Sequence, residues 1–156
     1  MKVFVVIVTF NRIELLKRSI ESVRANQPFG IIVINNGSTD GTKEWLDSQP
    51  DLIVIHQKNV GGSGGFYTGI KHAYNMGADW IWCMDDDVFP RADCLKNLLD
   101  NATDKNIGIL APRRIMDGKI FCHDFQGYNL TRPFKSMYRQ RLVNEQVTSP
   151  TFIAGT

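Results

Sequence analysis

The stretch "DWIWCMDDDVFP", residues 79–90, decides the fold class of this 156-residue chain. An apolar run of strand length leads directly into three consecutive aspartates, Asp85, Asp86 and Asp87. Like charges side by side repel, and a chain seldom places them at the end of a buried strand unless a cation offsets the repulsion. The stretch therefore predicts a buried strand that ends at a charged, ligand-binding edge of a sheet.

Three further apolar runs precede this one, and each is continuous, as in parallel strands that are buried on both faces. They span residues 3–9, 30–35 and 52–56. Helical spacing of apolar residues predicts helices over 12–25, 43–48 and 66–76. We expect Asn11 to cap the first helix and Ser38 or Asp40 to cap the second. Weaker runs at 107–112 and 119–122 predict two more strands, the second in a hairpin.

Strands and helices thus alternate along the first hundred residues, which predicts an α/β fold: a three-layer sandwich with a mostly parallel central sheet. In such sheets, ligands bind beyond the carboxyl ends of the strands. Four polar or glycine-rich segments lie there, at residues 9–12, 35–40, 58–66 and 85–87. Their convergence on one edge is stronger evidence for a site than any one of them.

The bulk composition excludes several classes of protein. The chain is 43% hydrophobic and 22% charged, which is ordinary for a globular protein, and its net charge of +2 is too small to predict a nucleic-acid partner. Three cysteines without CxxC spacing predict neither a zinc site nor a disulfide framework, so a reduced, cytoplasmic setting is the default. No apolar run approaches the roughly 20 residues that span a bilayer.

The three aspartates predict a metal site. Residues two apart on an extended segment point the same way, so Asp85 and Asp87 are expected to face one cleft. Hard oxygen ligands without nearby His or Cys suit Mg²⁺ or Mn²⁺, which also take phosphate oxygens. The alternative is that these acids favour the start of a helix near Pro90.

The stretch "NVGGSGGF", residues 59–66, is expected to be a loop whose glycines bring backbone N–H groups close to an anion. It matches neither the Walker loop nor the dinucleotide fingerprint, and the alternative is a flexible loop. Asn35 and Asn36 would read a base by hydrogen bonds. The three histidines, His56, His72 and His123, are isolated and are expected to be structural.

Four motifs, "VVIVTFNR", "VINNGSTDGT", "NVGGSGGF" and "DWIWCMDDDVFP", resemble in order and spacing those of family 2 glycosyltransferases with the GT-A fold, which is Rossmann-like. The resemblance covers roughly residues 3–100 and is closest to the galactofuranosyltransferase and rhamnosyltransferase-like branch, whose members build bacterial cell-wall or surface polysaccharides. It implies an inverting, metal-dependent transfer of sugar from a UDP- or dTDP-sugar to a glycan or lipid-linked acceptor.

The resemblance also implies roles for individual residues. Asp87 would hold the metal together with Asp85, as in the DXD motif of that family. The residues that would contact the nucleotide sugar are Thr9, Asn11, Arg12, Asn35, Asn36, Asn59, Gly61, Gly62, Gly64, Gly65, Asp85 and Asp86. The family's general base usually lies further along, so the catalytic base is expected beyond residue 156.

We therefore interpret residues 1–156 as a single nucleotide-sugar-binding domain, the N-terminal part of a longer enzyme that is cytoplasmic and works at the inner face of the membrane. Two alternatives stay open. A nucleotide-sugar-binding module would keep the motifs without turnover. A sugar nucleotidyltransferase would need a basic, glycine-rich loop after the first strand, where "TFNRIE" stands instead.

Overall fold

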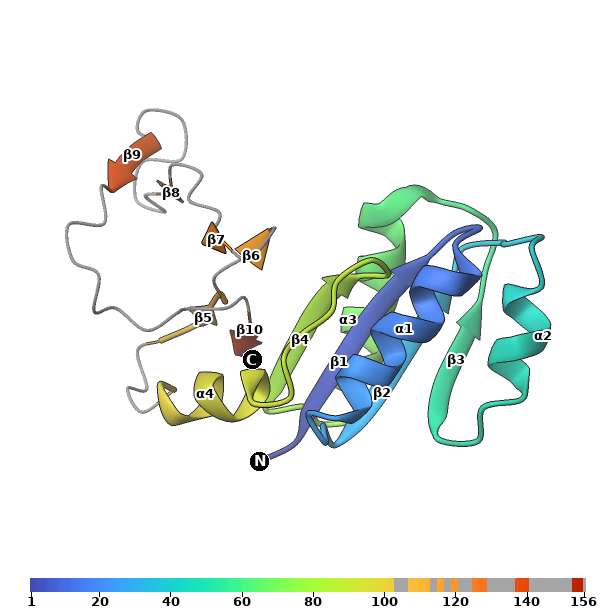
Figure 1. Cartoon of the computed structure of the whole chain (residues 1–156), viewed down its shortest axis with the longest axis horizontal. Coiled ribbons are helices and arrows are strands. Elements are labelled where there is room, and N and C mark those ends of the chain that lie inside the picture. Colours follow the sequence, from blue (N-terminus) through green and yellow to red (C-terminus); the bar gives the residue numbers. More distant parts are fainter. Residues whose placement is uncertain are drawn as a thin grey trace.

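The computed structural model describes residues 1–102 and 107–112, together with the backbone of short strands at 115–116, 119–120, 125–128, 137–140 and 153–155. The first eight elements alternate between strand and helix (Figure 1). They are β1 (Val3–Thr9), α1 (Ile13–Arg24), β2 (Gly30–Asn35), α2 (Thr42–Asp47), β3 (Leu52–His56), α3 (Gly61–Asn75), β4 (Trp80–Asp85) and α4 (Cys94–Asp100). Six short strands follow: β5 (Ile109–Leu110), β6 (Ile115–Met116), β7 (Lys119–Ile120), β8 (Phe125–Tyr128), β9 (Met137–Gln140) and β10 (Ile153–Gly155).

Among the described residues, the central sheet has six strands in the order β3-β2-β1-β4-β10-β5. The strands β3, β2, β1 and β4 pair in parallel, so the predicted mostly parallel sheet is confirmed. β10 pairs antiparallel with both β4 and β5, a return of the chain that the sequence did not predict. β7 forms an antiparallel hairpin with β6, as expected for that region, and β8 pairs antiparallel with β9.

Two apolar clusters, one on each face of the sheet, hold the three layers together. On one face, Val5 and Ile7 of β1 pack in a cluster with Leu16 and Ile20 of α1, to which α2 and α4 also contribute. On the other face, Phe4 and its neighbours on β1 and β2 pack in a cluster with Ala73 of α3. Because successive strand residues point to opposite faces, a continuous apolar β1 supplies both clusters. Figure 1 shows α1 and α3 on opposite faces of the sheet.

The stretch 59–66 was expected to be a loop and the helix to begin at residue 66. This is wrong, because α3 already begins at Gly61. Its glycines let the helix approach β1 closely. A Cβ atom at Gly65 would lie 2.5 Å from Cγ1 of Val8, and one at Gly69 would lie 2.3 Å from Cγ1 of Val6. Only a residue without a side chain fits at such contacts, so these two glycines serve helix-to-sheet packing.

Within the part of the chain that the structure describes, no helix combines the length and the apolar character needed to cross a bilayer. Cys122, His123 and Asp124 lie outside the described residues, and so do the predictions made for them.

Candidate functional site

The structure brings the four predicted segments together at the carboxyl edge of the sheet. The segment after β1 is joined to the segment after β2 by the backbone of Asn36, whose N–H donates to the carbonyl of Thr9 at 2.9 Å. The Asn36 side chain donates to the carbonyl of Gly61 at the start of α3, at 3.0 Å. The Thr9 hydroxyl donates to Asp86, after β4, at 2.7 Å. The convergence predicted from topology is therefore confirmed.

Asp86 is the buried member of the acidic run, with 4% of its surface exposed. Its carboxylate accepts the Thr9 hydroxyl, and Nη1 of Arg12 lies 3.5 Å from its second oxygen. Burial raises the pKa of Asp86 above its usual value, since the contacts with Thr9 and Arg12 only partly offset the loss of water. Asp86 is thus an anchor between β1 and β4 rather than a side chain presented to a ligand.

Asp85 and Asp87 are exposed, but the predicted extended geometry is wrong. β4 ends at Asp85, and Asp86 and Asp87 lie in a turn that the Val88 amide closes on the Asp85 carbonyl at 3.4 Å. The Asp87 side chain is 47% exposed and accepts from Nη1 of Arg12 at 2.9 Å. The described residues hold no group of three or more His, Cys, Asp or Glu side chains arranged around a metal position.

The two exposed carboxylates nevertheless fit a magnesium or manganese ion in their chemistry. Both ions prefer oxygen donors, and Mg²⁺ in particular is usually held by one or two protein carboxylates, with water and substrate phosphate as the other ligands. Asp85 and Asp87 offer that donor set at an exposed edge. The third carboxylate, Asp86, is turned inward and satisfied by protein partners.

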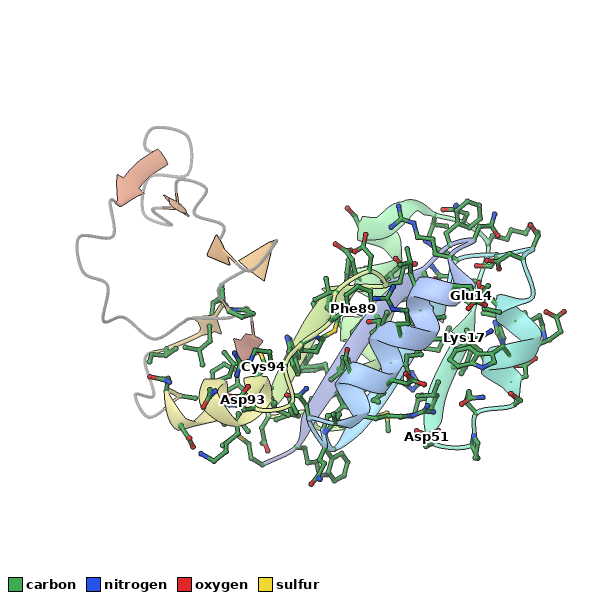
Figure 2. The ribbon with its side chains drawn as sticks, in the orientation of Figure 1. Glu14, Lys17, Asp51, Phe89, Asp93 and Cys94 are labelled. Atoms are coloured by element: carbon green, nitrogen blue, oxygen red, sulfur yellow. The ribbon has the colours of Figure 1, made fainter. Side chains whose placement is uncertain are left out.

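The loop after β4 is fastened to α1. The buried Ser19 hydroxyl donates to the Val88 carbonyl at 2.8 Å, and the Arg18 guanidinium carbon lies 4.6 Å from the centroid of the Phe89 ring. Figure 2 labels Phe89 in this loop. Beyond the loop, the amide of Leu95, the second residue of α4, donates to the side chain of Asn26, which follows α1, at 2.9 Å. These contacts hold the acidic run in place with respect to α1.

The N-cap role expected of Asn11 is wrong. Asn11 has a φ of 54°, a left-handed conformation that asparagine tolerates well, and its side chain turns away from α1. Its side-chain oxygen accepts the backbone amide of Thr39 at 2.7 Å, and its backbone N–H donates to the Ser38 hydroxyl at 3.0 Å. Asn11 therefore ties the loop after β1 to the loop after β2.

Asp40 takes over the capping role for two helices at once. Its Oδ2 accepts the amide of Ile13, the first residue of α1, at 3.0 Å. Its Oδ1 accepts the amide and the hydroxyl of Thr42, the first residue of α2, at 3.2 and 2.5 Å. Partial burial works to raise the pKa of Asp40, but the hydrogen bonds from Thr42 and Ile13 outweigh it, so the pKa lies below its ordinary value.

We expect Asp40→Ala to lower the free energy of unfolding by about 1–2 kcal/mol at pH 7, the cost of a lost helix cap. Because the folded pKa lies below the unfolded one, the contribution of Asp40 is complete above the unfolded pKa and is lost as the pH falls through the folded pKa. Urea unfolding at pH 7 and pH 3 measures both effects, and the gap between wild type and variant should narrow at pH 3.

Asp93→Ala is the matched control, because Asp93 sits at the N-cap of α4 but makes no side-chain cap hydrogen bond. It should shift the free energy of unfolding by less than about 0.5 kcal/mol. Equal losses in the two variants would contradict the capping role of Asp40.

Asn35 and Asn36 were predicted to read a base, but both are 2% exposed and their carboxamides are engaged by the protein. The Asn36 oxygen accepts the Gln57 side chain at 2.7 Å, while its nitrogen donates to Gly61. The Asn35 oxygen accepts the Ser38 amide at 2.9 Å. Neither carboxamide is presented to a ligand in this structure, so the two residues hold the loops of the edge together.

His56 joins Asn35 to α2. Its Nδ1 lies 3.1 Å from the Asn35 side-chain nitrogen, and its Nε2 lies 2.8 Å from Oδ1 of Asp47. Since the amide nitrogen of asparagine only donates, the ring accepts at Nδ1 and donates from Nε2. His56 thus has the structural role predicted for it.

The four glycines at the start of α3 divide into two pairs. At Gly61, which has a φ of 78°, and at Gly62, a Cβ atom would meet no described atom within 4 Å. A Cβ at Gly64 would lie 2.6 Å from the Val60 side chain, and Gly65 packs on β1. Asn59 accepts the Gly61 amide at 2.9 Å and so shapes this start. Of these four glycines, only Gly61 and Gly62 leave space beside the backbone, although the Gly61 N–H itself is bound by Asn59.

One candidate residue was missed in the sequence. Phe10 directly follows β1 at the ligand edge, and 45% of its surface is exposed. An aromatic side chain at the end of a buried strand, within "TFNR", is the signal that identifies it. Its ring offers a flat apolar surface at the site.

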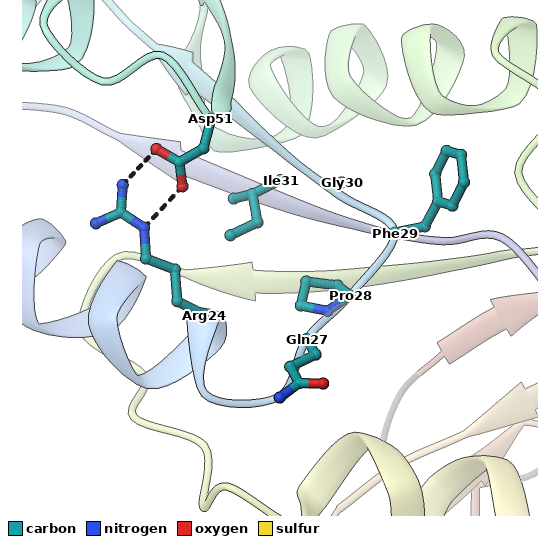
Figure 3. A pocket seen from close by; sticks show the side chains of 7 residues that line it. All are labelled: Arg24, Gln27, Pro28, Phe29, Gly30, Ile31 and Asp51. Atoms are coloured by element: carbon teal, nitrogen blue, oxygen red, sulfur yellow. Dashed lines mark hydrogen bonds and ion pairs between the residues drawn. The ribbon is translucent and has the colours of Figure 1, made fainter.

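A pocket of about 250 Å³ lies elsewhere, at the amino end of β2 (Figure 3). Residues 27–31 line it together with Arg24 and Asp51. Arg24 donates two hydrogen bonds to Asp51, at 2.8 and 2.7 Å. Because the strands run in parallel, this pocket is at the opposite edge of the sheet from the converging loops and does not belong to the site.

Comparison with known proteins identifies related chains. The family model described as "Glycosyl transferase family 2" matches residues 4–155. The galactofuranosyltransferase GlfT1 of Mycolicibacterium smegmatis is 36% identical over 112 residues, which cover 69% of this chain and 37% of that protein. The chain therefore spans little more than a third of the length of this relative.

Two solved structures resemble this one. TarS of S. aureus (residues 1–349) superimposes with a TM-score of 0.68 at 18% identity, covering 99% of this chain and 47% of that one. The mannosyltransferase PcManGT of Pyrobaculum calidifontis, solved with GDP-Man and Mn²⁺, has a TM-score of 0.57 at 22% identity and covers 69% and 34% of the two chains. At such identities, the likeness shows a shared fold.

Proposed function

Because the chain belongs to glycosyltransferase family 2 and has its predicted GT-A fold, we propose that its carboxyl edge binds a nucleotide-diphosphate sugar. The reaction is the inverting transfer of that sugar from a UDP- or dTDP-sugar to a glycan or lipid-linked acceptor. The observation that supports this proposal best is the meeting of Arg12, the open start of α3 and two exposed carboxylates at one edge. A role in bacterial cell-surface polysaccharide synthesis is part of this proposal, and the relative named galactofuranosyltransferase GlfT1 supports its sugar-transfer step.

The diphosphate is expected to lie against the start of α3. The first amides of a helix have no partner within the helix, and the helix dipole adds positive charge there. No side chain at Gly61 or Gly62 blocks the approach of an anion, and because Asn59 accepts the Gly61 amide, the amides that follow Gly61 are the ones proposed to bind it. The Gly61 backbone is held in that position by two side chains: Asn59 accepts from its N–H, and Asn36 donates to its carbonyl.

The nucleotide base is expected to stack on Phe10. The ring is exposed just after β1, whereas Asn35 and Asn36 are buried and both the oxygen and the nitrogen of each carboxamide contact other protein groups. Stacking of a base on an aromatic ring contributes about 1–3 kcal/mol and tolerates different bases. Base selection would then depend on groups other than the two asparagines.

Asp85 and Asp87 are the proposed ligands of a Mg²⁺ or Mn²⁺ ion, and the Mn²⁺ in PcManGT supports a divalent metal. When bound, such an ion supplies positive charge that stabilises the departing nucleoside diphosphate. Asp86 accepts the Thr9 hydroxyl and so fixes the three aspartates relative to the end of β1. Asp85 pairs with Val8 near the end of β1, so this proposed ligand lies beside the strand that Phe10 follows.

We assign no general base among the described residues. Residues 1–156 are proposed as the donor-binding, N-terminal part of a longer enzyme, in keeping with the greater length of GlfT1. The base that deprotonates the acceptor hydroxyl would come from the remaining part. With a lipid-linked acceptor, the enzyme would work at the cytoplasmic face of the membrane.

Calorimetry of UDP, dTDP and GDP binding, with and without Mn²⁺, tests this proposal. We expect the wild-type chain to bind at least one nucleotide only when Mn²⁺ is present. Asp87→Asn should weaken that binding about tenfold or more through loss of a metal ligand. Asp93→Asn removes an equal charge from an exposed site after β4 and should leave the binding unchanged.

Three results separate the alternatives. A folded wild-type chain that binds none of the nucleotides, with or without the metal, would contradict the proposal. Release of pyrophosphate from a nucleoside triphosphate and a sugar phosphate would instead indicate a nucleotidyltransferase. Metal-dependent binding without sugar transfer, even after the downstream sequence is restored, would indicate a binding module.

A further inference from the structure

A single basic side chain, Arg12, is paired with the acidic run. Its Nη1 lies 2.9 Å from Oδ2 of Asp87 and 3.5 Å from Oδ1 of Asp86. Asp87 and Arg12 are about half exposed, at 47% and 51%, whereas the Asp86 side chain is only 6% exposed. Among the ion pairs of the described residues, no other cation contacts the three aspartates, so the local charge balance rests on this guanidinium.

The same contact stands in the way of a divalent ion. A cation that binds Asp87 needs carboxylate oxygens, and one of these accepts a hydrogen bond from Arg12. The ion would also bring its charge close to the guanidinium, and like charges repel. Repulsion between the two cations therefore favours the departure of Arg12 from Asp87 before, or as, an ion binds there.

The structure allows the Arg12 side chain to move while its backbone stays in place. The Arg12 carbonyl accepts the Leu16 amide at 2.9 Å as part of the first turn of α1, and the next residue, Ile13, is held by Asp40. The guanidinium, by contrast, sits at the end of a long, half-exposed stem. A change of side-chain rotamer is enough to release Asp87.

A diphosphate at the same edge offers the guanidinium a better partner. Arginine binds phosphate oxygens through two parallel hydrogen bonds, and such charge-assisted bonds are stronger than neutral ones. On the basis of the proposed function, we infer that Arg12 is an exchangeable counter-ion: it neutralises Asp87 in the metal-free protein and transfers to the donor's phosphates when the metal ion takes its place. Metal and nucleotide binding are thereby coupled through one side chain.

A purely structural ion pair makes the opposite prediction. If Arg12 only fastened the loop after β4 to α1, its removal would loosen the acidic run and weaken the binding of a metal ion. If Arg12 competes with the ion, its removal strengthens metal binding in the absence of nucleotide. The sign of the change in Mn²⁺ affinity therefore distinguishes the two roles.

The experiment measures Mn²⁺ binding alone, from the free-ion signal in electron paramagnetic resonance, and then UDP binding at saturating Mn²⁺ by calorimetry. Arg12→Gln should bind Mn²⁺ alone about threefold more tightly, because a competing positive charge is gone. It should bind UDP about tenfold more weakly, as expected for a lost charged hydrogen bond. Arg12→Lys keeps the charge and should bind Mn²⁺ as the wild type does.

Arg18→Gln is the matched control. Arg18 lies in α1, which begins directly after Arg12, and it stacks on Phe89 without pairing with a carboxylate among the described residues, so both affinities should stay within about twofold of wild type. If Arg12→Gln leaves Mn²⁺ binding unchanged or weaker while the wild type binds Mn²⁺ and UDP, the inference is wrong and the proposed function stands. If the folded wild type binds neither, both fail together.

Discussion

Gly69→Val is expected to lower the free energy of unfolding by about 3 kcal/mol, the upper part of the range for overpacking a core. A Cβ atom at this position would lie 2.3 Å from Cγ1 of Val6 and 3.3 Å from Cγ1 of Ile34. Both partners are fully buried residues of central strands, so neither can move aside without disturbing the sheet. Valine adds two methyl groups to that clash. Urea denaturation followed by circular dichroism measures the loss.

Gly62→Ala is the control within the same helix. A Cβ atom there meets no described atom within 4 Å, and alanine favours the helix by up to about 1 kcal/mol over glycine. This variant should therefore be as stable as the wild type or more stable.

The double variant Gly69→Ala with Val6→Ala should recover part of the stability lost in Gly69→Ala. A Gly69→Val protein with the midpoint of the wild type would show that α3 does not pack as described.

Asp86→Ala is expected to lower the free energy of unfolding by about 1–3 kcal/mol, because the Thr9 hydroxyl loses its acceptor in a buried position. Thr9 is 1% exposed, so water cannot easily replace the carboxylate. Asp86→Asn keeps an acceptor oxygen at the same place and removes a charge that burial disfavours. The asparagine variant should therefore be clearly more stable than the alanine variant.

The pH dependence of Asp86→Asn gives a second test. Because the folded pKa of Asp86 is raised, the folded state holds its proton more tightly than the unfolded state does. Wild-type stability should then fall, relative to the asparagine variant, as the pH rises from the unfolded pKa through the raised folded pKa. Urea midpoints of both proteins across pH 3 to 7 measure this trend. Parallel curves would show that Asp86 does not titrate as its burial implies.

Most of the sheet could be predicted from the sequence because its strands are continuous apolar runs. The predicted strands at 3–9, 30–35 and 52–56 have the bounds of β1, β2 and β3, and the strand predicted before the aspartates is β4, which includes Asp85. A parallel strand that is buried on both faces needs such a run, and few other elements of that length produce one. Once the strands are known to be parallel, the usual connections between them limit the possible strand orders, and ligands are expected at the carboxyl ends of the strands.

The errors arose where distant contacts outweigh local preference. Glycine disfavours helices, so the glycine-rich stretch was predicted as a loop, yet close packing of α3 on β1 requires Gly65 and Gly69. Asparagine is a common N-cap residue, so Asn11 was expected to cap α1. The cap is provided instead by Asp40, which is 27 residues from Ile13 in the sequence. β10 has too few residues for its own signal and depends on pairing with β4 and β5.

The chemistry of the site was predictable only in outline. The acidic run and its position at the edge could be predicted from the end of an apolar strand. Which of its carboxylates is buried depends on Thr9, 77 residues away in sequence, and which is neutralised depends on Arg12. The hydrogen bonds that engage the Asn36 carboxamide likewise depend on partners, Gln57 and Gly61, that only the folded chain brings near.

The place of β10 in the sheet has a consequence for folding during synthesis. β5 reaches the rest of the sheet only through β10, which the ribosome makes roughly 40 residues later, a delay of about 2–8 s at ordinary rates of translation. During that interval, β4 presents an unpaired edge, and exposed edges recruit other chains. We expect nascent chains that stall between β5 and β10 to be the species most dependent on chaperones.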